Sequence, residues 1–503
     1  MTYRTRSLTL LLALFLVLAV APATSTASTT DLLDDVADAL GGDALAGLES
    51  FEAVASGTFW TLDEGPYPGS GAGAPGPYAT TATFDLTVDA QRLDTEMVSY
   101  FFFARTLAQV VTPDGGFVDG QDNNFGPPFV APMLSDRWAA TRLHQRLMYP
   151  QLLLQDAMAD PGSVEIAGNT LVFDTGGEPL TLQVDPSSGL PVRVSTIESD
   201  PLRRDVSVVV RYSRWRHVDG VAFPMVVTVE YDGAVVQHET RSSVAINVSP
   251  DPALFAFPAG IVPVFDADLA LRGVVRHQMI QSFAALGFPR DGVQPFVAGT
   301  EIAPGVYFLA GGSHNSLAVV QESGVTIVEA PLDEVRIAGI RDWVETNIGL
   351  PITYVVASHH HTDHTAGVRQ LVAAGAAAVV HEEAEHFFGT VFRARSTLIP
   401  DGMGEGPWPP VVVTVPAGGS YEIADAVNPV GIHTIESEHA SDLVLVEVGG
   451  VLFVVDIYNP GLPLTPEADP IIPRVLELGL EIDTIAGGHA GTISWDDFVA
   501  LFP

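Results

Sequence analysis

The chain has 503 residues, of which 47% are apolar and only 17% are charged, so it can bury large cores and does not belong to the disordered class. Its 61 acidic and 23 basic residues give a formal net charge of −38, which disfavours binding to nucleic-acid phosphates or to anionic lipid. The absence of cysteine excludes disulfides, thiolate metal ligands and a cysteine nucleophile.

The N-terminus has the pattern of a secretion signal. Two arginines precede an apolar run at residues 8–20, and small residues follow it, with cleavage expected after Ala23 or Ala27. The run is shorter than the roughly 20 residues that a helix needs to span a bilayer. We therefore predict a signal peptide over residues 1–27 and a secreted or periplasmic protein without a stable membrane anchor. An uncleaved anchor is the alternative.

Residues 30–255 predict a mainly β N-terminal domain. A helical pattern at residues 30–48 contains Gly41-Gly42 as its expected stop, and the Gly- and Pro-rich residues 63–78 predict a loop. One helix is expected around residues 137–158. Strands of an antiparallel sheet are expected at residues 82–88, 180–184, 206–212, 225–231 and 235–248. This layout, with residues 212–224, resembles the curved sheets of periplasmic lipoprotein carriers.

Residues 256–295 predict a linker containing a helix near residues 269–286. The sequence pattern changes after this linker. In residues 296–503, β-rich runs alternate with helical patterns, which is typical of a layered α/β domain. The expected helices are residues 332–348, 365–374 and 470–478. The expected strands are residues 306–310, 317–320, 325–328, 354–357, 378–380, 443–446 and 451–455.

The strongest chemical signal is the run His359-His360-His361-Thr362-Asp363-His364, which follows an apolar strand directly. Alternate side chains of an extended chain share a side, so His359, His361 and Asp363 can point into one pocket. A helical pattern then begins, which turns His364 to a neighbouring position and places Asp363 where a helix N-cap would be. Imidazoles and carboxylates at this density suit Zn²⁺ or a similar ion. The alternative is a His-rich loop without metal.

This run has the H-x-H-x-D-H signature and resembles the metallo-β-lactamase superfamily. The resemblance covers residues 296–503 and implies a four-layer αββα sandwich with two metal ions at its edge. It also implies a third histidine before a strand, for which His439 fits better than His433, an aspartate that ends a strand (Asp456), and a histidine between glycines (His489). The implied ligands are His359, His361 and His439 for the first metal, Asp363, His364 and His489 for the second, and Asp456 as the bridge.

Further polar residues accompany the implied ligands. Glu329 stands where many family members carry an aspartate, and His314 could line the pocket. His381 and His386 are expected at a helix start or on the surface. The resemblance implies two Zn²⁺ per chain, with iron or manganese as possible replacements.

The implied activity is a hydrolase in which a metal-bridging hydroxide attacks an ester, lactone, thioester or amide of a small-molecule substrate. Asp363 would orient this nucleophile and carry a proton to the leaving group. The aspartate bridge resembles glyoxalase II, lactonases and phosphodiesterases, and disfavours antibiotic hydrolysis. Two alternatives are a mononuclear iron oxygenase on the same fold and a periplasmic protein that binds lipid or another apolar ligand. No sequence feature indicates an oligomeric state.

Overall fold

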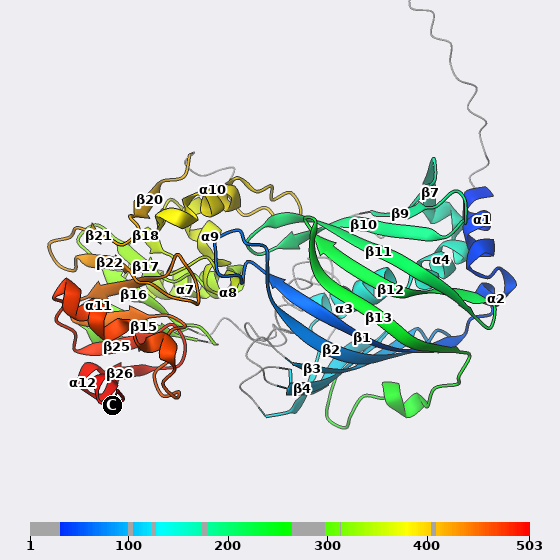
Figure 1. The fold of residues 1–503 in the computed structure, drawn as a ribbon, viewed down its shortest axis with the longest axis horizontal. Helices are drawn as coiled ribbons and strands as arrows, with labels where there is room; N and C mark the ends of the chain where they lie inside the picture. Colours follow the sequence, from blue (N-terminus) through cyan, green and yellow to red (C-terminus); the bar gives the residue numbers. More distant parts are fainter. Residues whose placement is uncertain are drawn as a thin grey trace, which may run out of the picture.

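The computed structural model describes residues 31–98, 104–122, 127–173, 179–263, 297–311, 313–403 and 409–502. It forms two lobes that lie side by side, as Figure 1 shows. The expected signal peptide and the helix expected near residues 269–286 lie outside the described residues. No helix in the described part of the chain is both long and apolar enough to cross a membrane.

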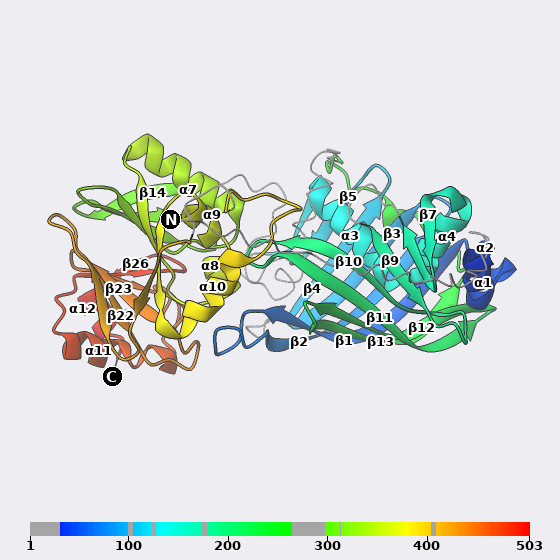
Figure 2. The same ribbon diagram turned by 90° about the horizontal axis from the view of Figure 1, so that it is seen from above.

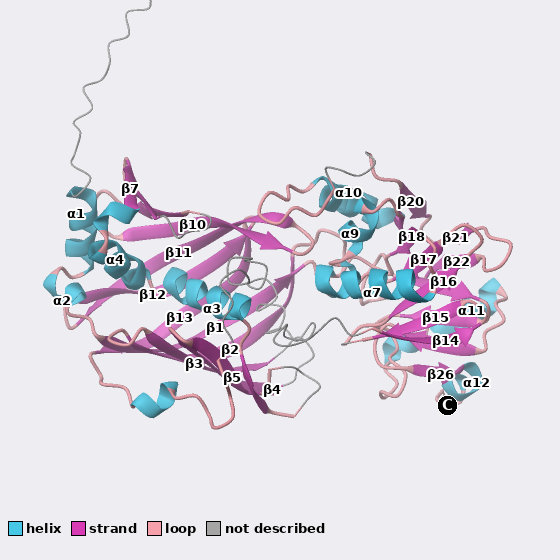
Figure 3. Ribbon diagram, turned by 180° about the vertical axis from the view of Figure 1, so that it is seen from behind, coloured by secondary structure: helices cyan, strands magenta, loops and turns pink. Residues whose placement is uncertain are grey.

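The N-terminal lobe is built on one curved antiparallel sheet (Figures 1 and 3). Strand β1 (Ser50–Leu62) pairs with both β2 (Ala72–Asp85) and β13 (Ala234–Ile246), so the first and last strands meet inside the sheet. From edge to edge the order is β6-β5-β4-β3-β2-β1-β13-β12-β11-β10-β9-β8-β7. The other strands are β3 (Ala90–Val98), β4 (Ala104–Thr112), β5 (Gly115–Gly120), β6 (Phe129–Pro132), β7 (Val164–Ala167), β8 (Thr170–Phe173), β9 (Leu180–Val184), β10 (Pro191–Asp200), β11 (Arg204–Val218) and β12 (Val221–Tyr231).

Helices cover one face of this sheet. They are α1 (Asp31–Leu40), α2 (Asp43–Ala46), α3 (Ser135–Met148) and α4 (Pro150–Ala159). Alternate residues of β11, Val206, Val208 and Val210, are at most 1% exposed and share a core with Val36 of α1 and Leu153 of α4. The period of two along the strand therefore selects the face that the helices bury.

Two expectations for this lobe are wrong in detail. The single helix expected around residues 137–158 is two helices, because Pro150 has no N–H to continue α3 and instead occupies the first turn of α4. The loop expected at residues 63–78 ends at residue 71. Beyond it, β2 pairs with β1 despite its glycines and prolines, and Gly76 leaves room for the ring of Phe59.

The C-terminal lobe contains two sheets that pack face to face. The first has the order β14-β15-β16-β17-β18-β19-β20 and the second β21-β22-β23-β24-β25-β26. The first comprises β14 (Ala298–Ala303), β15 (Val306–Ala310), β16 (Ser316–Val320), β17 (Val325–Val328), β18 (Ile352–Val356), β19 (Ala377–His381) and β20 (Val412–Val415). The second comprises β21 (Ser420–Ile423), β22 (Val430–Thr434), β23 (Val444–Val448), β24 (Val451–Val454), β25 (Thr484–Gly487) and β26 (Thr492–Ser494).

Three apolar clusters define four layers in this lobe. One cluster joins the first sheet to α7 (Glu334–Asn347), α9 (Val368–Ala373) and α10 (Glu385–Arg393). The middle cluster lies between the two sheets, and the third joins the second sheet to α11 (Ile471–Leu478) and α12 (Trp495–Val499). This αββα arrangement, which Figure 2 shows from above, confirms the predicted fold class.

The turn between β10 and β11 connects the two lobes. Leu202 in this turn is fully buried in the apolar cluster that contains Phe388 of α10. The next residues form polar contacts, because Arg204 donates to the carbonyl oxygen of Ile399 at 2.7 Å and Asp205 accepts from the Thr397 hydroxyl at 2.6 Å. The N-terminal lobe is therefore packed against the C-terminal lobe rather than merely tethered to it.

Candidate metal centre

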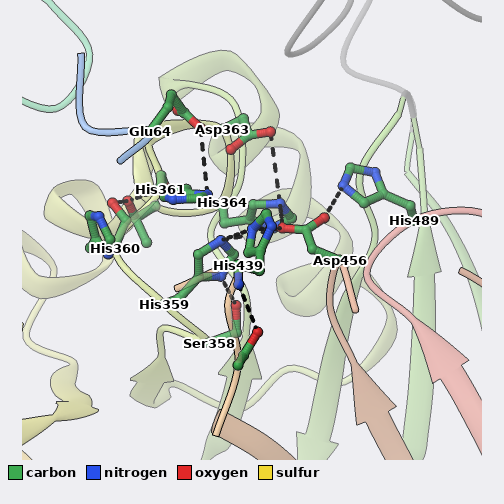
Figure 4. Close-up of polar contacts among 12 residues, drawn as sticks. Glu64, Ser358, His359, His360, His361, Asp363, His364, His439, Asp456 and His489 are labelled. Atoms are coloured by element: carbon green, nitrogen blue, oxygen red, sulfur yellow. Dashed lines mark hydrogen bonds and ion pairs between the residues drawn. The ribbon is translucent and has the colours of Figure 1, made fainter. Parts of the chain in front are cut away.

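The seven ligands that the sequence implies converge at one edge of the αββα sandwich (Figure 4). This is the edge where β18, β24 and β25 end, and consecutive segments contribute to it. His359 and His361 follow β18, Asp363 and His364 lie in α8 (Thr362–Thr365), His439 precedes β23, Asp456 follows β24, and His489 follows β25. β24 is buried throughout and β18 and β25 are buried at their carboxyl ends, so packing fixes where each of these segments begins.

The first group of donor atoms contains His359, His361, His439 and Asp456, whose donor atoms all lie within 4.8 Å of one another. The Nε2 atoms of His359 and His439 are 3.3 Å apart, and both face Asp456 Oδ2, at 3.3 and 3.0 Å. A cluster of imidazoles and one carboxylate, with no thiolate, fits the ligand preference of Zn²⁺ and similar first-row ions.

The second group contains the predicted residues Asp363, His364 and His489, together with His314, again within 4.8 Å. His314 lies between β15 and β16, and its Nε2 is 3.1 Å from Asp363 Oδ2. The other oxygen, Asp363 Oδ1, is buried and makes no hydrogen bond within the described residues. A buried carboxylate oxygen without a partner is costly, and a bound cation would satisfy it.

Asp456 lies between the two groups. Its Oδ2 is 3.0 Å from the Nε2 atoms of both His364 and His439, and its Oδ1 is 2.9 Å from His489 Nε2. The backbone of Asp456 has a φ of 59°, in the left-handed region. Glycine adopts this region freely, and for aspartate it is unfavourable, although less so than for most other residues. Strained backbone of this kind is held by its surroundings and concentrates at functional sites.

Outer contacts fix the orientation of the histidine rings. The second ring nitrogen, Nδ1, lies 2.8 Å from the Ser313 carbonyl oxygen in His489 and 2.7 Å from Glu329 Oε2 in His364. Both partners are acceptors, so Nδ1 carries the proton and donates it, and Nε2 faces the other ligands. Metal-binding histidines usually have such a partner on the nitrogen that does not bind the metal.

Electrostatics of the cluster also suit a cation. Burial lowers the pKa of His359 and of His361 well below the usual value, so both rings are neutral and have a lone pair to donate. Burial would lower the pKa of His364 as well, but the carboxylates of Asp456 and Asp363 outweigh it and raise that pKa. His364 and His439 in turn keep the pKa of Asp456 well below its usual range despite burial. A bound cation would take over the role of the proton on His364.

Several details of the site differ from the sequence interpretation. Asp363 is not the N-cap of α8. His361 occupies that position, and Asp363 lies inside the first turn, where its carboxylate faces His314. His314, for which the sequence suggested a place in the pocket lining, lies in the second group. His433 lies away from the cluster and pairs with the Ser420 hydroxyl, in keeping with the preference for His439.

His360 points away from the other histidines, as alternation along the chain predicts, and its Nδ1 lies 2.7 Å from Asp442 Oδ1. His381 caps the turn after β19, as expected for a residue at a helix start. One residue of the site had no signal in the sequence. Glu64 belongs to the N-terminal lobe, yet a carboxylate oxygen of it lies within 4.8 Å of donor atoms of His361 and Asp363.

No curated protein matches this chain. Solved structures do match its C-terminal lobe. Among solved structures, it is similar to the metallo-beta-lactamase FIM-1 from Pseudomonas aeruginosa in its mono-zinc form, with 18% identity over 41% of this chain and 97% of that one, at a TM-score of 0.32. A metallo-beta-lactamase from Pontibacter korlensis matches with 14% identity over 40% of this chain and 94% of its own, also at 0.32.

The family assignment comes from a family model and not from these low identities. The model of the metallo-beta-lactamase superfamily matches residues 309–489, and all seven implied ligands fall within that range. The four layers and the ligand cluster at their edge are those that the H-x-H-x-D-H signature implies. Residues 309–489 therefore form a domain of the metallo-beta-lactamase superfamily.

Proposed function

We propose that this chain is an exported hydrolase that uses two metal ions, normally zinc, to cleave an ester, lactone, thioester or amide bond of a small molecule. The observation that carries the proposal is the position of Asp456, whose carboxylate contacts histidines of both donor groups, His439 of the first and His364 and His489 of the second. Such a carboxylate can hold two cations at once.

The chemistry divides between the metals and the chain. Metal ions bound here would activate water at neutral pH and polarise the oxygen of the scissile bond. Asp363 is ionised, because His364 and His314 lower its pKa despite burial. As a ligand of the second group, Asp363 would orient the attacking water and pass its proton to the leaving group.

Exposure of the ligands indicates the side from which a substrate enters. The side chain of His489 is 20% exposed and that of His439 is 12% exposed, whereas that of His359 is fully buried. A substrate therefore reaches the centre along the edge between His439 and His489. The predicted signal peptide supports a secreted or periplasmic location, which matches a substrate met outside the cytoplasm.

Metal content per chain is the first test, measured by elemental analysis of protein purified without chelator. We expect about two zinc ions per chain, and hydrolysis in a screen of esters, lactones, thioesters and amides. About one iron per chain, with oxygen consumption, would replace the hydrolase with the mononuclear oxygenase. No metal even after reconstitution would overturn both enzymatic functions.

A His361→Ala variant tests the site itself. It removes one donor of the first group, so we expect loss of at least one metal ion per chain and a fall in hydrolysis below a hundredth of the wild-type rate. His386→Ala is the matched control, because His386 is exposed and lies outside the site. Full activity in His361→Ala would show that the site is assigned wrongly.

A further inference from the structure

The loop between β1 and β2, residues 63–71, reaches from the N-terminal lobe to the metal centre. In Figure 1 this hairpin meets the C-terminal lobe beside α8, and Figure 4 shows Glu64 next to His361. Glu64 Oε1 accepts a hydrogen bond from the Thr362 backbone N–H at 3.0 Å, and the Gly65 carbonyl oxygen lies 3.0 Å from His361 Nε2. Both contacts are buried, so they belong to the interior of the assembled protein.

The same loop also contacts the second segment that carries a ligand of the first group. The Pro66 carbonyl oxygen accepts a hydrogen bond from the Ser441 backbone N–H at 2.9 Å, two residues after His439. Three consecutive residues of the loop therefore hold both segments that close this side of the first group.

The loop is held firmly by its own lobe. Arg203 makes a bidentate ion pair with Asp63, with both N···O distances at 2.6 Å, and Arg203 follows the buried Leu202 that anchors the lobes together. Gly73 on β2 leaves space for Glu64, since a Cβ there would lie 2.7 Å from Glu64 Cβ. The position of Glu64 is thus fixed by the fold of the N-terminal lobe.

The Gly65 carbonyl has a chemical consequence for His361. A carbonyl oxygen can only accept, so Nε2 of the neutral His361 ring carries the proton and Nδ1 is left with a lone pair. Nδ1 is the nitrogen that faces Glu64, with Oε2 at 3.6 Å. A metal bound by the first group would therefore bind His361 through Nδ1, with the Glu64 carboxylate beside it.

We propose that the N-terminal lobe completes the metal centre through this loop: Gly65 positions His361 for metal binding, and Glu64 places a buried carboxylate beside its metal-facing nitrogen. The inference rests on the proposed metal centre. It assigns to the N-terminal lobe a part in metal binding, although the family match covers only the C-terminal lobe. Burial and the neighbouring Asp363 raise the pKa of Glu64 in the metal-free protein. A cation bound beside it would favour the ionised carboxylate, which would in turn attract the cation.

Zinc affinity of full-length variants tests the proposal, measured by competition with a chromogenic chelator. Glu64→Gln keeps the shape and the acceptor for Thr362 but removes the charge, and we expect zinc to bind 10 to 100 times more weakly. Gly73→Ala keeps Glu64 but displaces it, and we expect a loss in the same direction. The melting temperature of the metal-free Glu64→Gln protein should equal that of the wild type, because the hydrogen bond to Thr362 is retained.

Two controls separate this proposal from the function on which it rests. Glu52→Gln makes the same chemical change at an exposed position of β1 and should leave zinc affinity unchanged. If His361→Ala lowers zinc affinity while Glu64→Gln and Gly73→Ala bind as the wild type does, the loop has no part in the site and the proposal is overturned. If the wild type itself binds no metal, the proposed function fails first.

Discussion

Glu329 shows how one buried residue can serve both the fold and the site. Its Oε1 accepts the Ser358 backbone N–H at 2.8 Å, and its Oε2 lies 2.7 Å from His364 Nδ1. The residue is fully buried, and its φ of 70° lies in the left-handed region. Ser358 leads directly into the ligand segment, so Glu329 fixes both the backbone of that segment and the ring of His364.

Replacing Glu329 with alanine should therefore affect metal binding and stability together. We expect zinc affinity to fall 10- to 100-fold, because His364 loses the partner of its outer nitrogen. The unpaired Ser358 N–H should reduce the free energy of unfolding by about 1–3 kcal/mol. Chelator competition and chemical denaturation measure the two effects, with exposed Glu322→Ala as the control. Unchanged zinc affinity would contradict this role.

His433 gives the fold a dependence on pH that is separate from the metal centre. Burial, with the nearby Arg474, lowers its pKa from 6.5 to about 4. The folded protein therefore binds this proton less readily than the unfolded chain does. The free energy of unfolding falls as the pH drops from about 6.5 towards 4, and His433 has no effect on it above that window. The fall in melting temperature across this window should be smaller in His433→Gln than in the wild type. In the control His217→Gln, at an exposed position, the fall in melting temperature should be the same as in the wild type.

At the level of elements, the end of α11 illustrates why one glycine is needed. Gly479 follows the helix with a φ of 65°, and the Leu480 N–H returns to the Val475 carbonyl oxygen at 3.1 Å. No atom stands within 4 Å of a Cβ added there, so backbone strain is the only penalty for a side chain.

Gly479→Ala should accordingly lower the free energy of unfolding by about 1 kcal/mol. Gly479→Asn should lower it less, because asparagine tolerates the left-handed region better. Denaturant titration of the two variants beside the wild type provides the measurement. Equal stability of the alanine variant and the wild type would mean that the helix end relaxes.

Elements with strong periodicity were predictable from the sequence. The helix at residues 332–348 is α7, and the helix at residues 470–478 is α11, each within two residues of its expected ends. By contrast, β1 has small residues such as Ala55 and Gly57 in place of a marked alternation of apolar and polar side chains, so its strand character depends on pairing with β2 and β13. Local pattern cannot reveal such partners.

The candidate site divides in the same way. The sequence implied residues that share one segment or follow an apolar strand, such as His359 and Asp456, because strand ends are visible locally. Glu64 and Gly65 carried no signal, since their relation to His361 is created by the packing of one lobe on the other. The role of the implied ligands in holding metal stays a prediction until metal is measured.

For the whole molecule, the net charge of −38 is the dominant electrostatic feature. Acidic residues outnumber basic ones by 61 to 23, so repulsion among surface carboxylates opposes the compact state. Salt shortens the screening length from about 30 Å at 0.01 M to about 10 Å at 0.1 M. We expect the melting temperature of metal-loaded protein to rise as NaCl increases over that range. A constant or falling melting temperature would show that attractive ion pairs outweigh the repulsion.

The contact between Gly65 and His361 joins residues 296 positions apart in the chain. Contacts between residues so far apart in the chain slow folding, because the entropy of closing the long intervening loop is lost before the contact is gained. The N-terminal lobe is synthesised first and the ligand segment long afterwards, so the loop would reach the donor cluster only when the two lobes dock. Metal uptake at full affinity would then report that the two lobes have docked, and a chain arrested before docking would be distinguishable by weak, incomplete loading.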